Sequence, residues 1–176
     1  VAVPRSLHEG ARVLPVVPMF HVNSWGLPYG APLVGASMIM PGPALDGPSL
    51  FNLMDNEGVT ASWGVPTVWL GLKAEMEQRD AMPSKLDQLV IGGSAASRAM
   101  IAWFEDKGVD VCHAWGMTEM SPLGTVNSLL PKHDGLDREE IIKIKLKQGR
   151  LVFGVGMRIV YDEGKELPWD GKSSGH

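Results

Sequence analysis

Short apolar runs alternate along the chain with longer stretches whose apolar residues recur at helical spacing. Five of the short runs are typical of buried strands, because each is rich in apolar residues and ends at Gly, Pro or a polar loop. These runs are Arg12–Pro18, Ser37–Met40, Val59–Gly64, Leu86–Ile91 and Val109–Ala114.

The segments between these runs predict helices with recognisable ends. Asp46 can cap a helix that continues to Asn56. Pro66 suits the first turn of the next helix, since its missing N–H has no partner there in any case. Ser97 can cap a third helix, and Trp25–Gly35, punctuated by Gly and Pro, is expected to be helical in part.

The last third of the chain follows a different pattern. The charged segment Asp137–Lys147 predicts a surface helix, and the alternation of Lys143, Lys145 and Lys147 is expected of a solvated face. After it, Met157–Asp162 predicts a strand that enters a hairpin. Strands alternating with helices over short loops predict an α/β fold with a mostly parallel sheet flanked by helices, and a short β-hairpin region near the C-terminus.

Composition narrows the class of protein. The 176 residues are 44% hydrophobic, which suits a packed core, and the net charge of −4 argues against a nucleic-acid-binding surface. The apolar runs are interrupted too often for a membrane-spanning helix. Cys112 is the one cysteine, which excludes an internal disulfide and fits a reducing compartment, so we expect a cytoplasmic protein.

Two loops follow predicted strands at the edge where open parallel sheets bind ligands. One loop is Gly92–Ser97 and the other is Trp115–Pro122. If the two preceding strands are neighbours, both loops open onto the same crevice. In the first loop, Gly92 and Gly93 let the backbone bend sharply and let a flat ligand approach closely.

The second loop carries candidate chemistry. Trp115 offers a ring face on which a base can stack, and Thr118 offers a hydroxyl for a phosphate oxygen. Glu119 offers the kind of hard oxygen ligand that Mg²⁺ prefers beside a nucleotide phosphate. Gly-Gly turns and Trp-Gly pairs are also common in loops that bind nothing, so these residues alone leave both interpretations open.

The stretch "HAWGMTEMSP", His113–Pro122, resembles the Tyr-Gly-x-Thr-Glu motif of the adenylate-forming superfamily, which includes acyl-CoA synthetases, luciferases and peptide-synthetase adenylation domains. Three more stretches match that superfamily in order and spacing. "PMFHVNSWG" (Pro18–Gly26) resembles its Phe-His-x-x-Gly-type motif, and "IGGSAAS" (Ile91–Ser97) resembles its adenine loop. Lys147–Gly171 resembles the segment before the ribose-binding aspartate.

The resemblance implies an ATP-dependent reaction that uses Mg²⁺ and CoA. A carboxylate attacks the α-phosphate of ATP to give an acyl-adenylate, and the CoA thiol then forms a thioester. Thr118 would contact phosphate, Glu119 would hold Mg²⁺, and Trp115, in place of the usual Tyr, would flank the adenine. The implied nucleotide site also includes Gly93, Ser94, Ala95, His113, Gly116 and Met117.

The acid pocket is implied by the same resemblance. His21, Asn23 and Trp25 match positions at its entrance and wall. Amino-acid-activating relatives carry Asp where His21 stands, so a plain acid such as a fatty acid is favoured. A buried His can also serve only as a core hydrogen-bonding group, and Trp63 is assigned to the core, where large aromatics usually lie.

Residues 1–176 are expected to be a single excerpt of a longer AMP-binding N-terminal domain, because the superfamily's phosphate loop and C-terminal domain do not appear. The excerpt alone is expected to be inactive. The stretch Asp162–Gly175 is similar to medium-chain fatty acyl-CoA and methylmercaptopropionate-CoA ligases.

Two alternatives to a fatty acyl-CoA synthetase stay open: an adenylation domain with another acceptor, and a non-catalytic α/β nucleotide-binding module. The expected partners are a small carboxylic acid, ATP and CoA. The sequence does not decide between a monomer and a homodimer.

Overall fold

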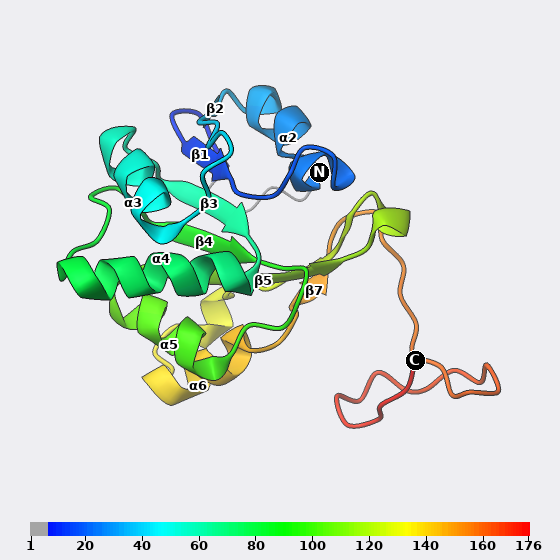
Figure 1. Cartoon of the computed structure of the whole chain (residues 1–176). Helices are drawn as coiled ribbons and strands as arrows, with labels where there is room; N and C mark the ends of the chain where they lie inside the picture. Colours follow the sequence, from blue (N-terminus) through cyan, green and yellow to red (C-terminus); the bar gives the residue numbers. More distant parts are fainter. Residues whose placement is uncertain (1–6) are drawn as a thin grey trace.

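A seven-stranded sheet organises residues 7–176, the part of the chain that the computed structural model describes (Figure 1). The strand order is β2-β1-β3-β4-β5-β6-β7, in which neighbours among the first five strands pair in parallel and the β5–β6 and β6–β7 pairs are antiparallel. The strands are β1 Arg12–Pro15, β2 Ser37–Met38, β3 Ala61–Gly64, β4 Gln88–Ile91, β5 Asp110–Gly116, β6 Leu123–Val126 and β7 Arg150–Leu151. The predicted α/β class with a mostly parallel sheet is confirmed.

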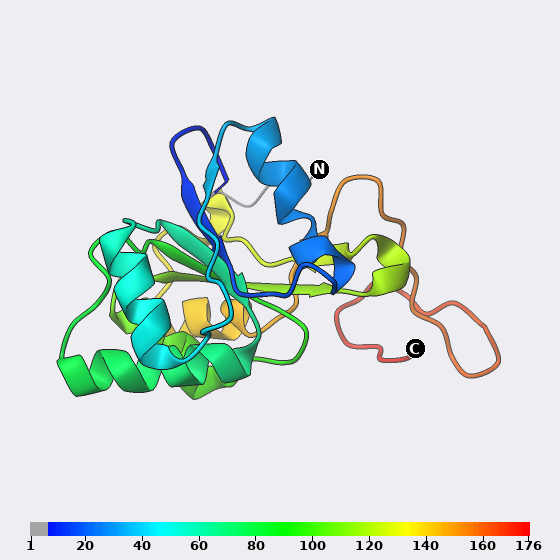
Figure 2. The same ribbon diagram turned by 45° about the horizontal axis from the view of Figure 1, so that its top comes forward.

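Helices cover both faces of the parallel part of the sheet (Figures 1 and 2). The helical elements are α1 Val22–Trp25, α2 Leu27–Leu33, α3 Gly47–Asn56, α4 Pro66–Arg79, α5 Arg98–Asp106 and α6 Arg138–Lys145, with short 3-10 turns η1 Thr118–Met120 and η2 Pro131–His133. One core cluster joins α3, α4, α5 and α6 to the sheet, and a smaller one joins α2 to the opposite face. Side chains alternate between the two clusters along each strand, so Leu89 and Ile91 enter the first and Val90 enters the second.

The predicted helix starts are confirmed by their capping hydrogen bonds. The Ser49 N–H donates to the Asp46 carboxylate at 2.9 Å, and the Met100 N–H donates to Ser97 Oγ at 3.2 Å. Each cap satisfies a backbone donor that the first turn of the helix leaves without a partner. The local sequence therefore fixed where α3 and α5 begin.

The expectation of a solvated lysine face on α6 is wrong for Lys145. Lys145 is only 2% exposed, and its Nζ lies 2.7 Å from the Glu105 carboxylate and also pairs with Asp110. The helical period places Lys145 three residues after Ile142, on the face that packs against α5 and β5. The lysines alternate every second residue in the sequence, so the helical period of 3.6 residues was not recognised.

The C-terminal segment leaves the body of the fold (Figure 1). No regular strand forms over the predicted range Met157–Asp162, but a short hairpin is present: Val160 and Glu166 form an antiparallel bridge, and the Leu167 N–H donates to the Ile159 carbonyl at 2.8 Å. Longer antiparallel pairing is made by β5, β6 and β7. Within residues 7–176, no helix has the length and apolar character needed to cross a bilayer.

Candidate functional site

A partly open cavity lies at the carboxyl ends of β4 and β5. Four segments close it: the α1 turn, the end of β3, the Gly92–Gly93 loop and the β5–β6 hairpin. The lining includes His21, Trp25, Trp63, Val90, Trp115 and Thr118.

The two predicted ligand loops share this cavity because their strands are direct neighbours. In the parallel ladder Ile91 of β4 lies opposite His113 of β5, so the loops leave the sheet side by side. Gly92 and Gly93 line one wall, and Trp115–Thr118 line another. The structure thus brings together the two stretches that sequence reasoning selected.

The second loop is the tip of an antiparallel hairpin. β5 turns through η1 into β6, and the Met117 N–H donates to the Pro122 carbonyl at 2.8 Å. A Cβ at position 116 would overlap that same carbonyl, so only Gly116 lets the two strands approach this closely. The tight tip places Thr118 on the cavity wall. Glu119 follows it in η1 and is exposed at the hairpin tip, outside the set of lining residues.

The segment before α2 is a left-handed turn. Val22, Asn23, Ser24 and Trp25 all have φ between 47° and 55°, and Gly26 follows at 81°. Left-handed backbone is costly for residues with a Cβ, and most of all for a β-branched one. The turn is held by the buried Ser24 hydroxyl, which donates to the Val17 carbonyl at 2.6 Å.

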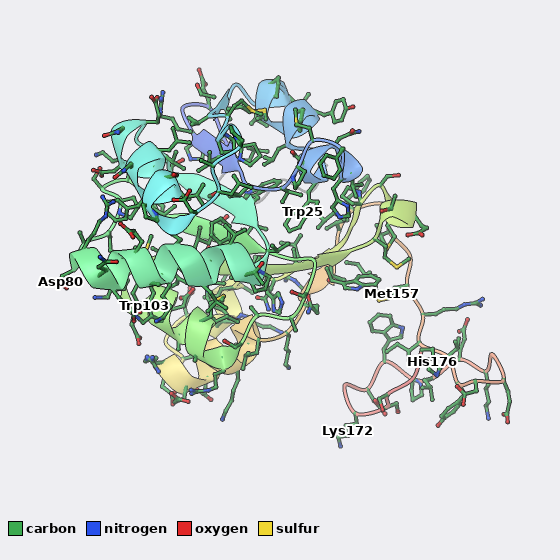
Figure 3. The ribbon with its side chains drawn as sticks, viewed as in Figure 1. Trp25, Asp80, Trp103, Met157, Lys172 and His176 are labelled. Atoms are coloured by element: carbon green, nitrogen blue, oxygen red, sulfur yellow. The ribbon has the colours of Figure 1, made fainter. Side chains whose placement is uncertain are left out.

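The left-handed turn sets which of its side chains reach the cavity. His21, Val22 and Trp25 line the wall, and Trp25 lies between α2 and the β5–β6 hairpin (Figure 3). Asn23 does not line it: its Nδ2 donates to Tyr29 Oη at 3.3 Å on the exposed side. Of the three predicted pocket residues, two therefore meet at the cavity and one turns away.

Some of the remaining residues predicted for the nucleotide site line the cavity, and others lie outside it. Gly93, Gly116 and Met117 line the cavity, and Trp115 stays 36% exposed at its mouth. Ser94 and Ala95 are exposed beyond the cavity lining.

His113 does not line the cavity but contacts the backbone of the Gly92–Ser97 loop. The residue is 1% exposed, and the Ala96 N–H donates to its Nε2 at 3.4 Å, with Gln148 Nε2 at 3.3 Å from the same nitrogen. Burial lowers the pKa of this imidazole below its ordinary 6.5, and nearby backbone carbonyls offset only part of that effect. A neutral ring with Nε2 as acceptor fits both contacts.

Trp63 is one of the lining residues that sequence reasoning did not place in the site. It was assigned to the core, and it is indeed only 7% exposed, but its indole lines the cavity. In the structure Trp63 pairs with Val90 near the ends of β3 and β4, so both side chains face the same side of the sheet. The sequence signal was the place of Trp63 next to Gly64, at the carboxyl end of a predicted strand.

The donor set at the hairpin tip fits a magnesium ion held mainly by a nucleotide. Within residues 7–176, no cluster of three or more His, Cys, Asp or Glu side chains could hold a metal alone. Mg²⁺ is commonly bound through one or two carboxylates together with substrate phosphates and water. Glu119, beside Thr118, can supply the single carboxylate.

Comparison with known proteins gives consistent results. The model of the AMP-binding enzyme family matches residues 2–176. The chain is 50% identical over 99% of its length to the medium-chain-fatty-acid–CoA ligase of Ectopseudomonas oleovorans. It is 53% identical over 93% of its length to the 3-methylmercaptopropionyl-CoA ligase of Ruegeria lacuscaerulensis. The chain spans about a third of the length of these curated relatives, 33% and 30% respectively.

Solved structures agree on the fold. The N-terminal domain of FACL13 from Mycobacterium tuberculosis matches with a TM-score of 0.77 and 20% identity, over 95% of this chain and 38% of that one. The anthranilate CoA ligase AuaEII, in complex with anthranoyl-AMP, matches with a TM-score of 0.72 and 26% identity, over 92% of this chain and 30% of that one.

Proposed function

The chain belongs to the AMP-binding enzyme family, and we propose that it is the acid- and nucleotide-binding part of an AMP-forming acyl-CoA ligase. Residues 1–176 would be one excerpt of that enzyme's N-terminal domain. The complete enzyme would activate a fatty or similar organic acid with ATP and Mg²⁺ and transfer it to CoA in the cytoplasm.

One observation carries the proposal: the β4 loop, the β5–β6 hairpin and the α1 turn line a single cavity, with buried residues that form its floor and exposed residues at its mouth. Val90 and Trp63 supply the floor, which suits an alkyl chain. Thr118 and the Gly92–Gly93 backbone stand at the mouth, where a nucleotide can approach closely. The acid's carboxylate and the α-phosphate would therefore meet at the boundary between floor and mouth.

The residues at the mouth have separate tasks in the proposed reaction. The Thr118 hydroxyl donates to a phosphate oxygen and so helps to hold the phosphate in line with the attacking carboxylate. Glu119 holds the magnesium ion, which, when bound, neutralises phosphate charge so that two anions can react. Trp115, partly exposed at the mouth, offers its face to the adenine.

The acid is proposed to be a medium- or short-chain one without an ammonium group. His21 lines the cavity where a carboxylate would be needed to pair with an amino acid's ammonium. The similar ligases are named for medium-chain fatty acids and for 3-methylmercaptopropionate, which agrees with an acid of this size.

The test is a panel of carboxylic acids on the full-length parent enzyme, read by acid-dependent pyrophosphate release and then by CoA-dependent thioester formation. We expect turnover with at least one medium- or short-chain acid. Calorimetry with ATP and Mg²⁺ on the same enzyme should show metal-dependent binding that weakens in Glu119→Gln.

The matched control is Glu163→Gln, at an exposed position in the C-terminal turn away from the cavity. It should behave as wild type. Equal metal-dependent binding by wild type and Glu119→Gln, with no turnover on any acid, would favour a non-catalytic nucleotide-binding module.

A further inference from the structure

Building on the proposed function, we infer that Trp63 is a specificity-determining residue whose bulk sets the longest acid that the site accepts. The ring ends the part of the cavity that takes the alkyl chain, so an acid below a certain length fits and a longer one meets the indole. The proposed substrate class is thereby narrowed to acids with a sharp upper chain length, and that limit is assigned to one side chain.

Trp63 is the bulky residue of the cavity floor. The lining residues that are buried, and so form the floor, are Trp63, Val90, Gly92 and Ala114. Of these four, only Trp63 carries a side chain large enough to stop an alkyl chain that runs along the sheet. Its Nε1 is itself buried, so Trp63 serves the cavity as an apolar wall and not as a hydrogen-bond donor.

The position of Trp63 in the sheet shows which side of the cavity it ends. The strands that contribute lining residues are β3, β4, β5 and β6, and β1 lies on the other side of β3. In the two parallel ladders, Trp63 lies opposite Val90 of β4 and opposite Pro15 of β1. Trp63 therefore stands between the cavity and the core that α2 and β1 share.

The core on the far side of Trp63 consists of smaller apolar side chains. Ala61 precedes Trp63 by two residues on β3 and so shares its face of the sheet, and Val13 of β1 lies opposite Ala61. Leu27 and Ala31 of α2 belong to the same cluster, and all four residues are at most 1% exposed. A smaller residue at position 63 would extend the cavity toward this core, where additional methylene groups would be buried.

Close packing turns such a wall into a sharp limit. While the alkyl chain still fits, each additional buried methylene should improve kcat/KM about fourfold, because burial removes apolar surface from water. Once the chain reaches Trp63, a further methylene must displace a ring that the core supports from behind, and packed interiors resist such insertions. We therefore expect the rate to rise with chain length and then to fall abruptly.

The experiment measures kcat/KM by pyrophosphate release on the full-length parent enzyme, with straight-chain acids from butyrate to dodecanoate. Wild type should show the rise of about fourfold per methylene and then the abrupt fall. In Trp63→Leu the preferred acid should become longer by about two carbons or more, because the lost ring leaves space for them. Trp63→Phe, a smaller truncation, should shift the preference by less.

Trp103→Leu is the matched control, since it makes the same change on the opposite face of the sheet. Trp103 belongs to α5 and packs, partly buried, against the larger core cluster. This variant should keep the wild-type length preference. The comparison separates a local change in cavity size from a general loosening of the fold.

The possible results lead to different conclusions. A wild-type profile with no upper limit would overturn the inference, and this result requires no variant. An unchanged preference in Trp63→Leu, or in Trp63→Phe should the leucine variant not fold, would also overturn it, as would an equal shift in Trp103→Leu. If wild type turned over no acid of any length, the proposed ligase function itself would be contradicted, which is a distinguishable result.

Discussion

Gly92 and Trp25 are in such close contact that a side chain at position 92 would be crowded. A Cβ at position 92 would lie 3.1 Å from Cη2 of Trp25 and 3.2 Å from the Ala114 carbonyl oxygen. Gly92 directly follows β4, and Trp25 comes from the left-handed turn far from it in sequence. Their contact joins the two walls of the cavity.

We therefore expect Gly92→Ala to impair the site. The added methyl must push the Trp25 ring or the loop aside, which moves groups that line the cavity mouth. In the full-length enzyme kcat/KM should fall about tenfold or more, because small misplacements at a reacting centre are costly. Acid-dependent pyrophosphate release measures the effect.

Gly156→Ala is the matched control, since a Cβ there has nothing within 4 Å and the backbone does not need positive φ. It should leave activity unchanged. If Gly92→Ala were as active as Gly156→Ala, the close contact would have no part in shaping the site.

Much of the fold could be predicted because it depends on local sequence. The caps at Asp46 and Ser97 and the proline start of α4 lie where short-range hydrogen bonding and backbone restriction place them. The parallel sheet followed from alternating strands and helices, and the neighbouring β4 and β5 brought the Gly92 loop to the Thr118 hairpin tip.

The features that could not be predicted depend on contacts between distant residues. The left-handed turn at Val22–Trp25 contradicts the local preference of Val and Trp, and it is held by the buried Ser24 hydroxyl on Val17. Lys145 is buried because Glu105 and Asp110 approach it from other elements. Neither the left-handed turn nor the burial of Lys145 can be predicted from a short segment of sequence, because both depend on residues distant along the chain.

Lys145→Met should destabilise the protein. Its Nζ bridges Glu105 on α5 and Asp110 on β5, and it also donates to the Val111 carbonyl at 3.2 Å. Removing the cation leaves carboxylates without their counter-charge, which we expect to lower the free energy of unfolding by about 3 kcal/mol. Urea unfolding followed by circular dichroism measures the loss.

Lys143→Met on the same helix is the control, since Lys143 is exposed and should tolerate the change. Equal stability of the two variants at neutral pH would contradict the role of Lys145.

The stabilisation by Lys145 should persist to high pH. Burial alone would lower the pKa of Lys145, but the charges of Asp110 and Glu105 outweigh burial, and the pKa lies above the usual 10.5. The stabilisation is therefore fully present below pH 10.5 and is lost only as the pH rises through the raised pKa.

The His113 imidazole should make stability depend on pH in the opposite direction. Because burial lowers its pKa when folded, the unfolded chain takes up a proton near pH 6.5 while the folded one does not yet. The contribution of His113 to the free energy of unfolding should thus be fully present above pH 6.5 and decline as the pH falls below that value. Urea unfolding at pH 7.5 and pH 5.5 measures the difference.

His113→Gln separates this effect from other titrating groups. Its amide oxygen can still accept from the Ala96 N–H, but it does not titrate. The variant should lose less stability between the two pH values than wild type does. An identical pH dependence in both proteins would assign the decline to carboxylates elsewhere.

The last prediction concerns the hydroxyl of Thr118. This residue lines the cavity at the hairpin tip and is exposed, so Thr118→Val keeps the branched shape and removes only a hydrogen-bond donor. If the hydroxyl contacts phosphate during adenylate formation, kcat for pyrophosphate release should fall about 100-fold in the full-length enzyme, as for other lost transition-state donors. The melting temperature should stay unchanged.

Thr118→Ser restores the donor and should recover most of the activity, which distinguishes a hydroxyl effect from a packing effect. The split between kinetic constants adds a second criterion. A contact that strengthens as charge develops lowers kcat, whereas one made equally in the ground state raises only the KM for ATP. A Thr118→Val enzyme with normal kcat and normal KM would show that the hydroxyl touches no phosphate, and the role of the hairpin tip would then rest on its backbone and on Glu119.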